Sequence, residues 1–214
     1  MTVALIVANF AVWIFYQLPN LDNSVVELAY QPCEVVSSCP PGTAVGESWE
    51  VTWLTSVFMH GSWLHIIGNM LFLWIFGNNV EDAMGKVRFL IFYLLSGLAA
   101  TTLQTVVTLS AGTAAAAAVP NLGASGAVSG VLGAYLILLP TAKVLTIVFF
   151  FLVEVRAFLF LGIWFLFQVY QGGFSLTHPE AGGGVAFFAH VGGFVFGAVT
   201  VHLFAKRPPL RPAY

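Results

Sequence analysis

Repeated long apolar runs constrain this chain more than any other feature of its sequence. Six stretches are almost wholly hydrophobic, and several approach the roughly 20 residues that a helix needs to cross about 30 Å of hydrocarbon. Only 7% of the 214 residues are charged, whereas about a quarter is usual in soluble domains. Because a helix satisfies its own backbone polar groups, each run is predicted to span a membrane as a helix. The predicted spans are 3–18, 63–80, 89–109, 125–139, 155–170 and 185–204.

These runs predict an all-α membrane protein, a six-helix bundle that forms a single domain over residues 1–214. The first run has no basic segment before it and no cleavage site after it, which favours an anchor helix over a signal peptide. A net charge of −2, with no basic patch and no glycine-rich phosphate loop, gives no indication of a nucleic-acid partner. No cofactor is expected.

The basic residues predict how the bundle is oriented. With six spans, both termini lie on one side of the membrane, and all seven Lys and Arg residues fall on that side. The positive-inside rule makes this side cytoplasmic. We therefore expect a multi-pass protein of the plasma membrane with cytoplasmic termini and an extracytoplasmic loop over residues 19–55. The basic residues are Lys86, Arg88, Lys143, Arg156, Lys206, Arg207 and Arg211.

The extracytoplasmic loop holds both cysteines of the chain, Cys33 and Cys39. Two cysteines in a short loop in an oxidising compartment favour a disulfide, and the alternative is two free thiols. A zinc site needs more ligands than this loop offers. The five-residue spacing of His60 and His65 does not suit a metal pair on one helix. No metal site is therefore expected.

A serine flanked by small residues opens the fourth predicted span, in the sequence Gly-Ala-Ser125-Gly. Its backbone N–H group lies in a first helical turn, where it has no intrahelical acceptor and where the helix dipole favours negative charge. This position supplies an oxygen nucleophile and donors for a developing oxyanion, but no base. Candidate bases lie far away in the sequence, at His60, His65 and His190.

Small residues recur every four positions in the fourth and sixth predicted spans. One stripe begins at Gly126, directly after Ser125, and the other includes Gly193 and Gly197, after His190. Taken alone, each stripe is a packing motif that lets membrane helices approach closely. Docking of the two stripes would bring the hydroxyl within reach of the imidazole. Both side chains are predicted at the extracytoplasmic ends of their helices.

His65 and Asn69 lie four residues apart in the second predicted span and therefore point from one helix face. Polar side chains at membrane depth are costly and normally face the bundle interior. Interhelical hydrogen bonding would explain either residue alone. Two such residues on one face, at the same membrane boundary as Ser125, favour a functional site. His60 precedes the span and belongs to its entry turn.

Together, these motifs resemble those of the rhomboid intramembrane serine proteases, and the six-span bacterial form is the most similar. The resemblance implies that Ser125 is the nucleophile and that His190 is its general base, in a dyad without an aspartate. It also implies that His65, Asn69 and the Ser125 backbone N–H form the oxyanion hole. The residues in supporting positions are His60, Gly123, Gly126, Gly193 and Gly197.

The resemblance implies a serine endopeptidase that cleaves single-span membrane proteins within or near their transmembrane helix. The expected partners are such substrates and the lipid bilayer, and the sequence makes no prediction of oligomeric state. The main alternative is a non-catalytic rhomboid-like protein that binds membrane clients, against which the intact Ser125–His190 pair argues. A channel or transporter is a third class, but the chain shows no inverted repeat.

The chain departs from the family pattern in two places. Many relatives carry a Trp-Arg pair where this chain has Val51 and Thr52, so the docking of the first loop is not predicted by the resemblance. A Phe or Tyr often stands four residues after the nucleophile, and here that residue is Ser129. The group that stacks behind His190 is therefore also left open.

Overall fold

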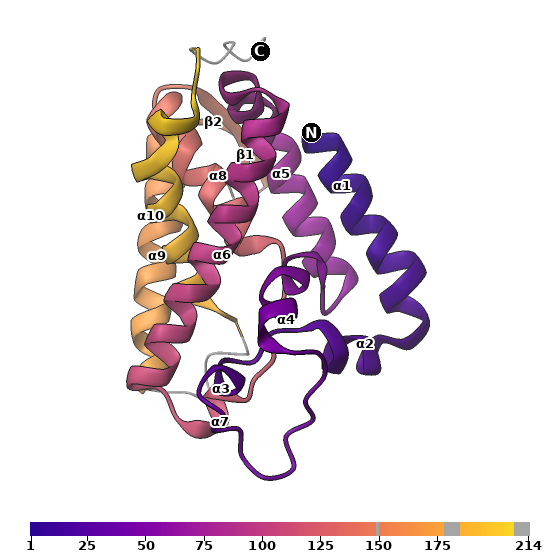
Figure 1. The fold of residues 1–214 in the computed structure, drawn as a ribbon. Coiled ribbons are helices and arrows are strands. Elements are labelled where there is room, and N and C mark those ends of the chain that lie inside the picture. Colours follow the sequence, from indigo (N-terminus) through magenta and orange to yellow (C-terminus); the bar gives the residue numbers. More distant parts are fainter. Residues whose placement is uncertain (149, 178–184, 208–214) are drawn as a thin grey trace.

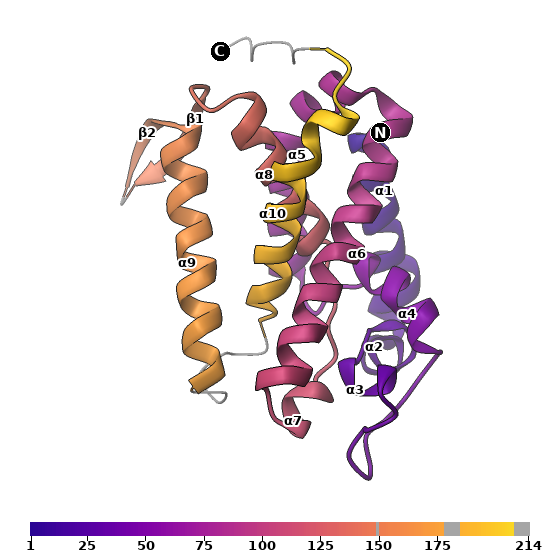
Figure 2. The ribbon, with the colours of Figure 1, turned by 60° about the vertical axis from the view of Figure 1, so that its left-hand side comes forward.

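The structure is a computed structural model that describes residues 1–148, 150–177 and 185–207. These residues form a bundle of helices with one small β-hairpin at its side (Figures 1 and 2). The helices are α1 (Thr2–Ala11), α2 (Leu21–Leu28), α3 (Pro32–Val35), α4 (Trp49–Thr55), α5 (Trp63–Met84), α6 (Lys86–Ala111), α7 (Ala114–Ala117), α8 (Ser125–Leu138), α9 (Ala157–Thr177) and α10 (Phe187–Phe204). The strands are β1 (Lys143–Val148) and β2 (Phe151–Arg156).

Four helical segments of the described chain are long and apolar enough to cross a membrane. The predicted count of six is not confirmed. α5 has 22 residues but carries several polar side chains, and α8 has only 14, fewer than a full crossing needs. The fifth predicted span, 155–170, extends further than expected, because α9 continues to Thr177; residues 178–184 lie outside the described part. The four segments are Thr2–Leu28, Lys86–Ala111, Ala157–Leu176 and Phe187–Phe204.

Charged groups tie several segments together at one end of the bundle, where the chain begins and α5 turns into α6 (Figure 1). The amino group of Met1 lies 2.6 Å from a carboxylate oxygen of Glu81. Arg207 donates from Nε to the backbone carbonyl of Asp82 at 2.7 Å, and Arg88 donates to the last carbonyl of α10. These contacts bring together segments that the positive-inside rule assigned to one side.

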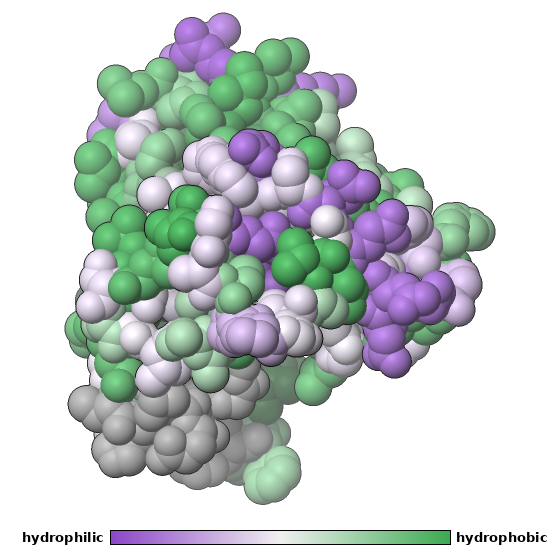
Figure 3. All heavy atoms as spheres, turned by 60° about the horizontal axis from the view of Figure 1, so that its bottom comes forward, coloured by the Kyte–Doolittle hydropathy of each residue, from purple (hydrophilic) through white to green (hydrophobic). Residues whose placement is uncertain are grey.

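The opposite end of the bundle is built by the first loop, which folds into α2, α3 and α4 (Figure 1). In the structure, a disulfide joins Cys33 and Cys39, the arrangement favoured over two free thiols. Tyr30 pairs with Asn121 through two backbone hydrogen bonds of 3.0 and 2.7 Å, and its hydroxyl lies 2.9 Å from Thr105 Oγ1. The loop is thus fixed to α6 and to the segment that leads into α8. Hydrophilic residues gather across the middle of this end (Figure 3).

The apolar segment after α8 forms an antiparallel β-hairpin, the one sheet in a described chain that is otherwise mostly helical, as expected of an all-α membrane protein. Strand pairing begins with Lys143 opposite Arg156. β1 contains valine, threonine and isoleucine, β2 contains two valines, and such β-branched residues favour extended chain. The hairpin projects beside α9 (Figure 2). The fifth span predicted at 155–170 therefore begins later, at Ala157, because its first two residues belong to β2.

α8 and α10 are in direct backbone contact. A side chain at Gly193 would overlap the carbonyl oxygen of Gly126, and one at Gly197 would overlap that of Gly130. The two predicted stripes therefore face each other at a separation that only glycine allows. Gly126 also faces Ala100 of α6, whose Cβ lies 2.6 Å from where a Cβ on Gly126 would stand. α8 is consequently held between α6 and α10.

Replacing Gly193 by alanine is expected to destabilise the bundle, because the added methyl group has to push α8 and α10 apart. Overpacking of this kind typically costs about 1–3 kcal/mol. Thermal unfolding of the purified protein in detergent measures the loss. The matched control is Gly162→Ala in α9, where an added Cβ meets no atom within 4 Å. Equal changes in Tm for the two variants would contradict the described packing.

Candidate active site

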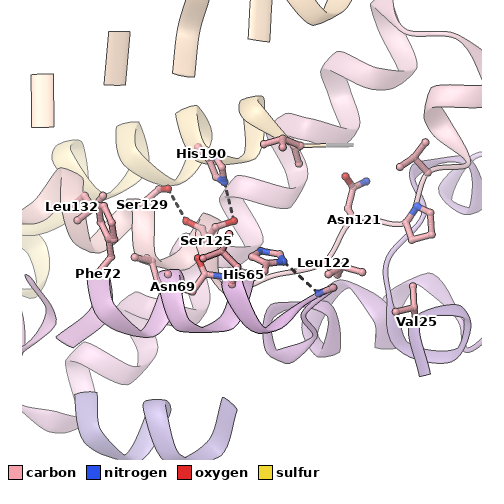
Figure 4. Close-up of a pocket in the computed structure, with 18 of the residues that line it drawn as sticks. Val25, His65, Asn69, Phe72, Asn121, Leu122, Ser125, Ser129, Leu132 and His190 are labelled. Carbon is pink, nitrogen blue, oxygen red and sulfur yellow. Dashed lines mark hydrogen bonds between the residues drawn. The ribbon is translucent and has the colours of Figure 1, made fainter. Parts of the chain in front are cut away.

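Ser125 is the first residue of α8, and His190 lies in the first turn of α10. The close contact of these two helices brings their side chains together, with His190 Nε2 lying 2.8 Å from Ser125 Oγ (Figure 4). A hydroxyl donating to an imidazole nitrogen at this distance is the geometry of a nucleophile and its base. Two residues that lie 65 positions apart in the chain thus form one hydrogen-bonded pair.

The imidazole of His190 is held by aromatic rings and by a third side chain. The ring of Trp164 lies 6.0 Å from it between centroids, and that of Phe187 meets it edge-on at 6.5 Å. His190 Nδ1 lies 2.8 Å from Gln168 Oε1. Both Trp164 and Gln168 belong to α9. The sequence did not predict which group stacks behind His190, and in the structure this group is the ring of Trp164.

Neither Trp164 nor Gln168 was among the predicted site residues. Gln168 is the one amide side chain in the predicted span 155–170 and is 5% exposed. A buried amide in a membrane helix needs a partner, so this isolated polar residue was the available signal. Ser129, which stands where relatives often carry an aromatic residue, instead donates to the backbone carbonyl of Ser125 at 2.6 Å (Figure 4).

His65 and Asn69 approach the serine from α5 (Figure 4). The N–H of Gly61 donates to His65 Nδ1 at 3.4 Å, which leaves the proton of a neutral ring on Nε2. A Cβ built on Gly123 would lie 2.7 Å from this Nε2 and 3.6 Å from Ser125 Oγ, so both atoms border one small space. Asn69 Nδ2 is buried without a hydrogen-bond partner among the described residues and is therefore a free donor.

The start of α8 adds backbone donors to the same space. The Val128 N–H donates to the Ala124 carbonyl at 2.9 Å, so the N–H groups of Ser125, Gly126 and Ala127 precede the first intrahelical bond. The positive end of the helix dipole lies at the same point. These groups, with His65 and Asn69, can stabilise negative charge that develops next to Ser125 Oγ.

His60 lies behind these donors and does not pair with the nucleophile. Its ring is fully buried and meets that of His65 edge-on, with 5.1 Å between centroids. The Gln17 side chain holds its backbone, donating to the carbonyl at 2.9 Å and accepting from the N–H at 2.8 Å. Burial lowers the pKa of His60 to about 3, so the ring is neutral at neutral pH. This position fits a role in supporting His65.

The candidate site lines a cavity of about 680 Å³ between α5, α8, α9 and the start of α10. Polar groups from Ser125, His65 and Asn69 converge there, and apolar side chains make up much of the remaining wall. Within the described residues, no group of His, Cys, Asp and Glu side chains is arranged to hold a metal ion. The apolar lining includes Phe72, Val128, Leu132 and Trp164.

Comparison with known proteins gives one consistent result. The sequence matches the Rhomboid domain over residues 46–207. Rhomboid protein 1, mitochondrial, of Saccharomyces cerevisiae is 32% identical over 146 residues, which is 68% of this chain and 38% of the yeast protein. Presenilin-associated rhomboid-like protein, mitochondrial, of Bos taurus is 29% identical over 146 residues, which is 68% of this chain and 34% of the bovine protein.

A bacterial relative is similar over a shorter stretch. Putative rhomboid protease YdcA of Bacillus subtilis is 32% identical over 124 residues, which is 58% of this chain and 55% of the Bacillus protein. The alignments therefore cover 34% to 55% of the length of these three relatives.

Replacing Gly123 by alanine is expected to slow the reaction of Ser125 with a fluorophosphonate probe by at least tenfold. The residue has φ +126°, and its new Cβ would displace the His65 ring. Gly42→Ala is the matched control, because Gly42 also has a positive φ, +85°, but no atom lies within 4 Å of its added Cβ. Labelling rates of the two variants in detergent provide the comparison. An unchanged rate for Gly123→Ala would show that the approach of His65 is unimportant for the serine.

Proposed function

Because the chain belongs to the rhomboid family, whose domain covers residues 46–207, we propose that it is an intramembrane serine endopeptidase. Its substrates are single-span membrane proteins, cut within or near the transmembrane helix. The observation that carries this proposal is the 2.8 Å contact between Ser125 Oγ and His190 Nε2, in a bundle with four helical segments long and apolar enough to cross a membrane. Acyl transfer to a serine requires such a contact, whereas holding a membrane client does not.

In the proposed reaction, Ser125 Oγ attacks the scissile carbonyl carbon while His190 Nε2 takes the hydroxyl proton. The C–N bond then breaks, the imidazolium returns its proton to the leaving amine, and the acyl group remains on Ser125 as an ester. A water molecule attacks this ester as His190 takes one of its protons. Collapse of the second tetrahedral intermediate releases the new carboxyl end and restores the Ser125 hydroxyl.

Both tetrahedral intermediates carry a negative oxygen that has to be stabilised. His65 Nε2–H, the Asn69 amide and the Ser125 backbone N–H are its proposed donors, in line with the small space they border beside Ser125 Oγ. Fixed donors in a site of low dielectric need little reorganisation as charge develops, which is why they lower the barrier. His60 is proposed to support this arrangement from behind.

The proposed substrate has to unwind before it is cut. Carbonyl groups inside a helix are already hydrogen-bonded, so a scissile bond becomes accessible only where the helix is weak. We therefore propose substrates with glycine or proline near the cut and small residues beside it. The 680 Å³ cavity offers room for such a segment and for the hydrolytic water. No cofactor takes part in the proposed reaction.

We propose a plasma-membrane location with cytoplasmic termini and an active site that opens to the extracytoplasmic side. The cluster of charged groups around Met1, Arg88 and Arg207 supports this orientation, since it lies at one end of the bundle. The disulfide between Cys33 and Cys39 supports an oxidising environment at the other end.

Ser125→Ala and His190→Ala are each expected to abolish cleavage of a single-span reporter protein in liposomes, because each removes one half of the reacting pair. Ser110→Ala, at the exposed end of α6, is the control and should cleave like the wild type. Gel analysis of the reporter over a broad panel of transmembrane sequences measures this. Equal cleavage by wild type and Ser125→Ala would show that cleavage does not depend on Ser125, and no cleavage by either across the panel would favour the non-catalytic client-binding alternative.

Asn69→Ala is expected to lower kcat by about 10²–10³ while KM stays nearly constant, because the lost donor acts mainly on the charged intermediate. Asn78→Ala is the matched control on the same helix: Asn78 is exposed and its amide donates to the Trp74 carbonyl at 3.2 Å. Reporter cleavage at varied substrate concentration in proteoliposomes separates the two constants. A loss confined to KM would assign Asn69 to substrate binding.

A further inference from the structure

Gln168 occupies a position that the catalytic proposal does not explain. It lies within α9, a helix with many exposed apolar side chains, yet it is 5% exposed and points toward the bundle interior. Its Oε1 is 2.8 Å from His190 Nδ1, on the side of the imidazole opposite Ser125. An uncharged amide placed this way contacts the base without entering the reaction. What it does to His190 depends on which end of the amide faces the ring.

A second hydrogen bond determines the orientation of the amide. Gln168 Nε2 donates to the backbone carbonyl of Trp164, one helical turn earlier, at 3.3 Å. A carbonyl oxygen only accepts, so the NH₂ end has to face Trp164 and the oxygen has to face His190. Because an amide oxygen also only accepts, the hydrogen in the contact with His190 belongs to the ring. The neutral imidazole therefore carries its proton on Nδ1.

This tautomer is the productive one. With the proton on Nδ1, Nε2 has a free lone pair, and Nε2 is the atom 2.8 Å from Ser125 Oγ. The opposite tautomer would aim an N–H at the serine oxygen and could not take its proton. Serine proteases with a triad fix the same tautomer with an aspartate. A neutral amide achieves this without the desolvation cost of a buried carboxylate.

We propose that Gln168 is a positioning residue, which fixes the Nδ1–H tautomer and the ring orientation of His190 so that Nε2 accepts the Ser125 proton. This inference rests on the proposed protease activity for its catalytic consequence, but not for the tautomer itself. Trp164 contributes to this positioning in two ways: its backbone carbonyl orients the Gln168 amide, and its ring lies against the His190 imidazole. The functional unit is thus Ser125, His190 and Gln168.

The kinetic test compares two replacements of Gln168. Gln168→Met keeps a similar volume but has no strong acceptor, and kcat is expected to fall about tenfold, the size typical of one buried hydrogen bond, with KM unchanged. Gln168→Glu keeps an acceptor for Nδ1–H, so this variant is expected to retain most of the wild-type kcat. Gln31→Met controls for loss of a buried glutamine: Gln31 is 3% exposed and donates to the Ala44 carbonyl. It should lower Tm without lowering kcat.

The tautomer of His190 can be measured by ¹⁵N NMR in the absence of substrate. In protein labelled with ¹⁵N-histidine, the ring nitrogens of His190, assigned by their loss in His190→Asn, should show a protonated Nδ1 and an unprotonated Nε2. Gln168→Met should shift this population toward Nε2–H. A wild-type ring protonated on Nε2, or a tautomer unaffected by Gln168→Met, would overturn the inference.

The two measurements separate this inference from the proposed function. If wild type cleaves the reporter and Gln168→Met has an unchanged kcat, the role of Gln168 is wrong and the protease proposal stands. If wild type cleaves no reporter, the protease proposal fails, and the ¹⁵N spectra alone decide whether Gln168 sets the tautomer.

Discussion

The direct contact between the backbones of α8 and α10 is the constraint on which the rest of the site depends. Glycines at 193 and 197 leave no side chain between the two helices, so the carbonyl oxygens of Gly126 and Gly130 lie where Cβ atoms would otherwise be. This contact fixes the start of α8 against the start of α10, where Ser125 Oγ lies 2.8 Å from His190 Nε2. The packing of the two helices therefore sets the position of the Ser125–His190 pair.

The polar groups around Ser125 are held in place mostly by other polar groups, as expected at membrane depth, where an unsatisfied group is costly. Gln168 contacts His190, Gly61 contacts His65, and Gln17 holds the backbone of His60. Among the described residues, Asn69 Nδ2 and both ring nitrogens of His60 are buried without a hydrogen-bond partner, and of these two residues Asn69 lines the cavity. A donor left free in this way is understandable when its acceptor arrives with the substrate.

Much of the site was predictable because its signals are local in the sequence. The serine among small residues, the pair four apart on α5, and the two small-residue stripes each have a recognisable spacing, and the stripes also indicated which helices meet. Gln168 was not predictable, since a single polar residue in an apolar run does not reveal its partner. The ring of Trp164 was also missed, because the aromatic ring next to His190 comes from α9, whereas the family pattern places it on the helix that carries the serine.

The architecture was predictable only in part. Hydrophobicity located the helices but not their ends: the apolar stretch after α8 pairs with itself as β1 and β2, because its β-branched residues suit strands as well as helices. The short fourth span, predicted at 125–139, agrees with α8 to within one residue. The folded first loop could not be read from its polar composition, since the pairing of Tyr30 with Asn121 joins segments far apart in the chain.

The most direct test of the account is a crystal structure of the protein after reaction with a fluorophosphonate. We expect phosphorus bonded to Ser125 Oγ, His190 Nε2 within hydrogen-bonding distance of the adduct, and the phosphoryl oxygen next to His65 and Asn69. Phosphorus on any other side chain, or an imidazole turned away from Ser125 with α8 and α10 separated, would contradict it.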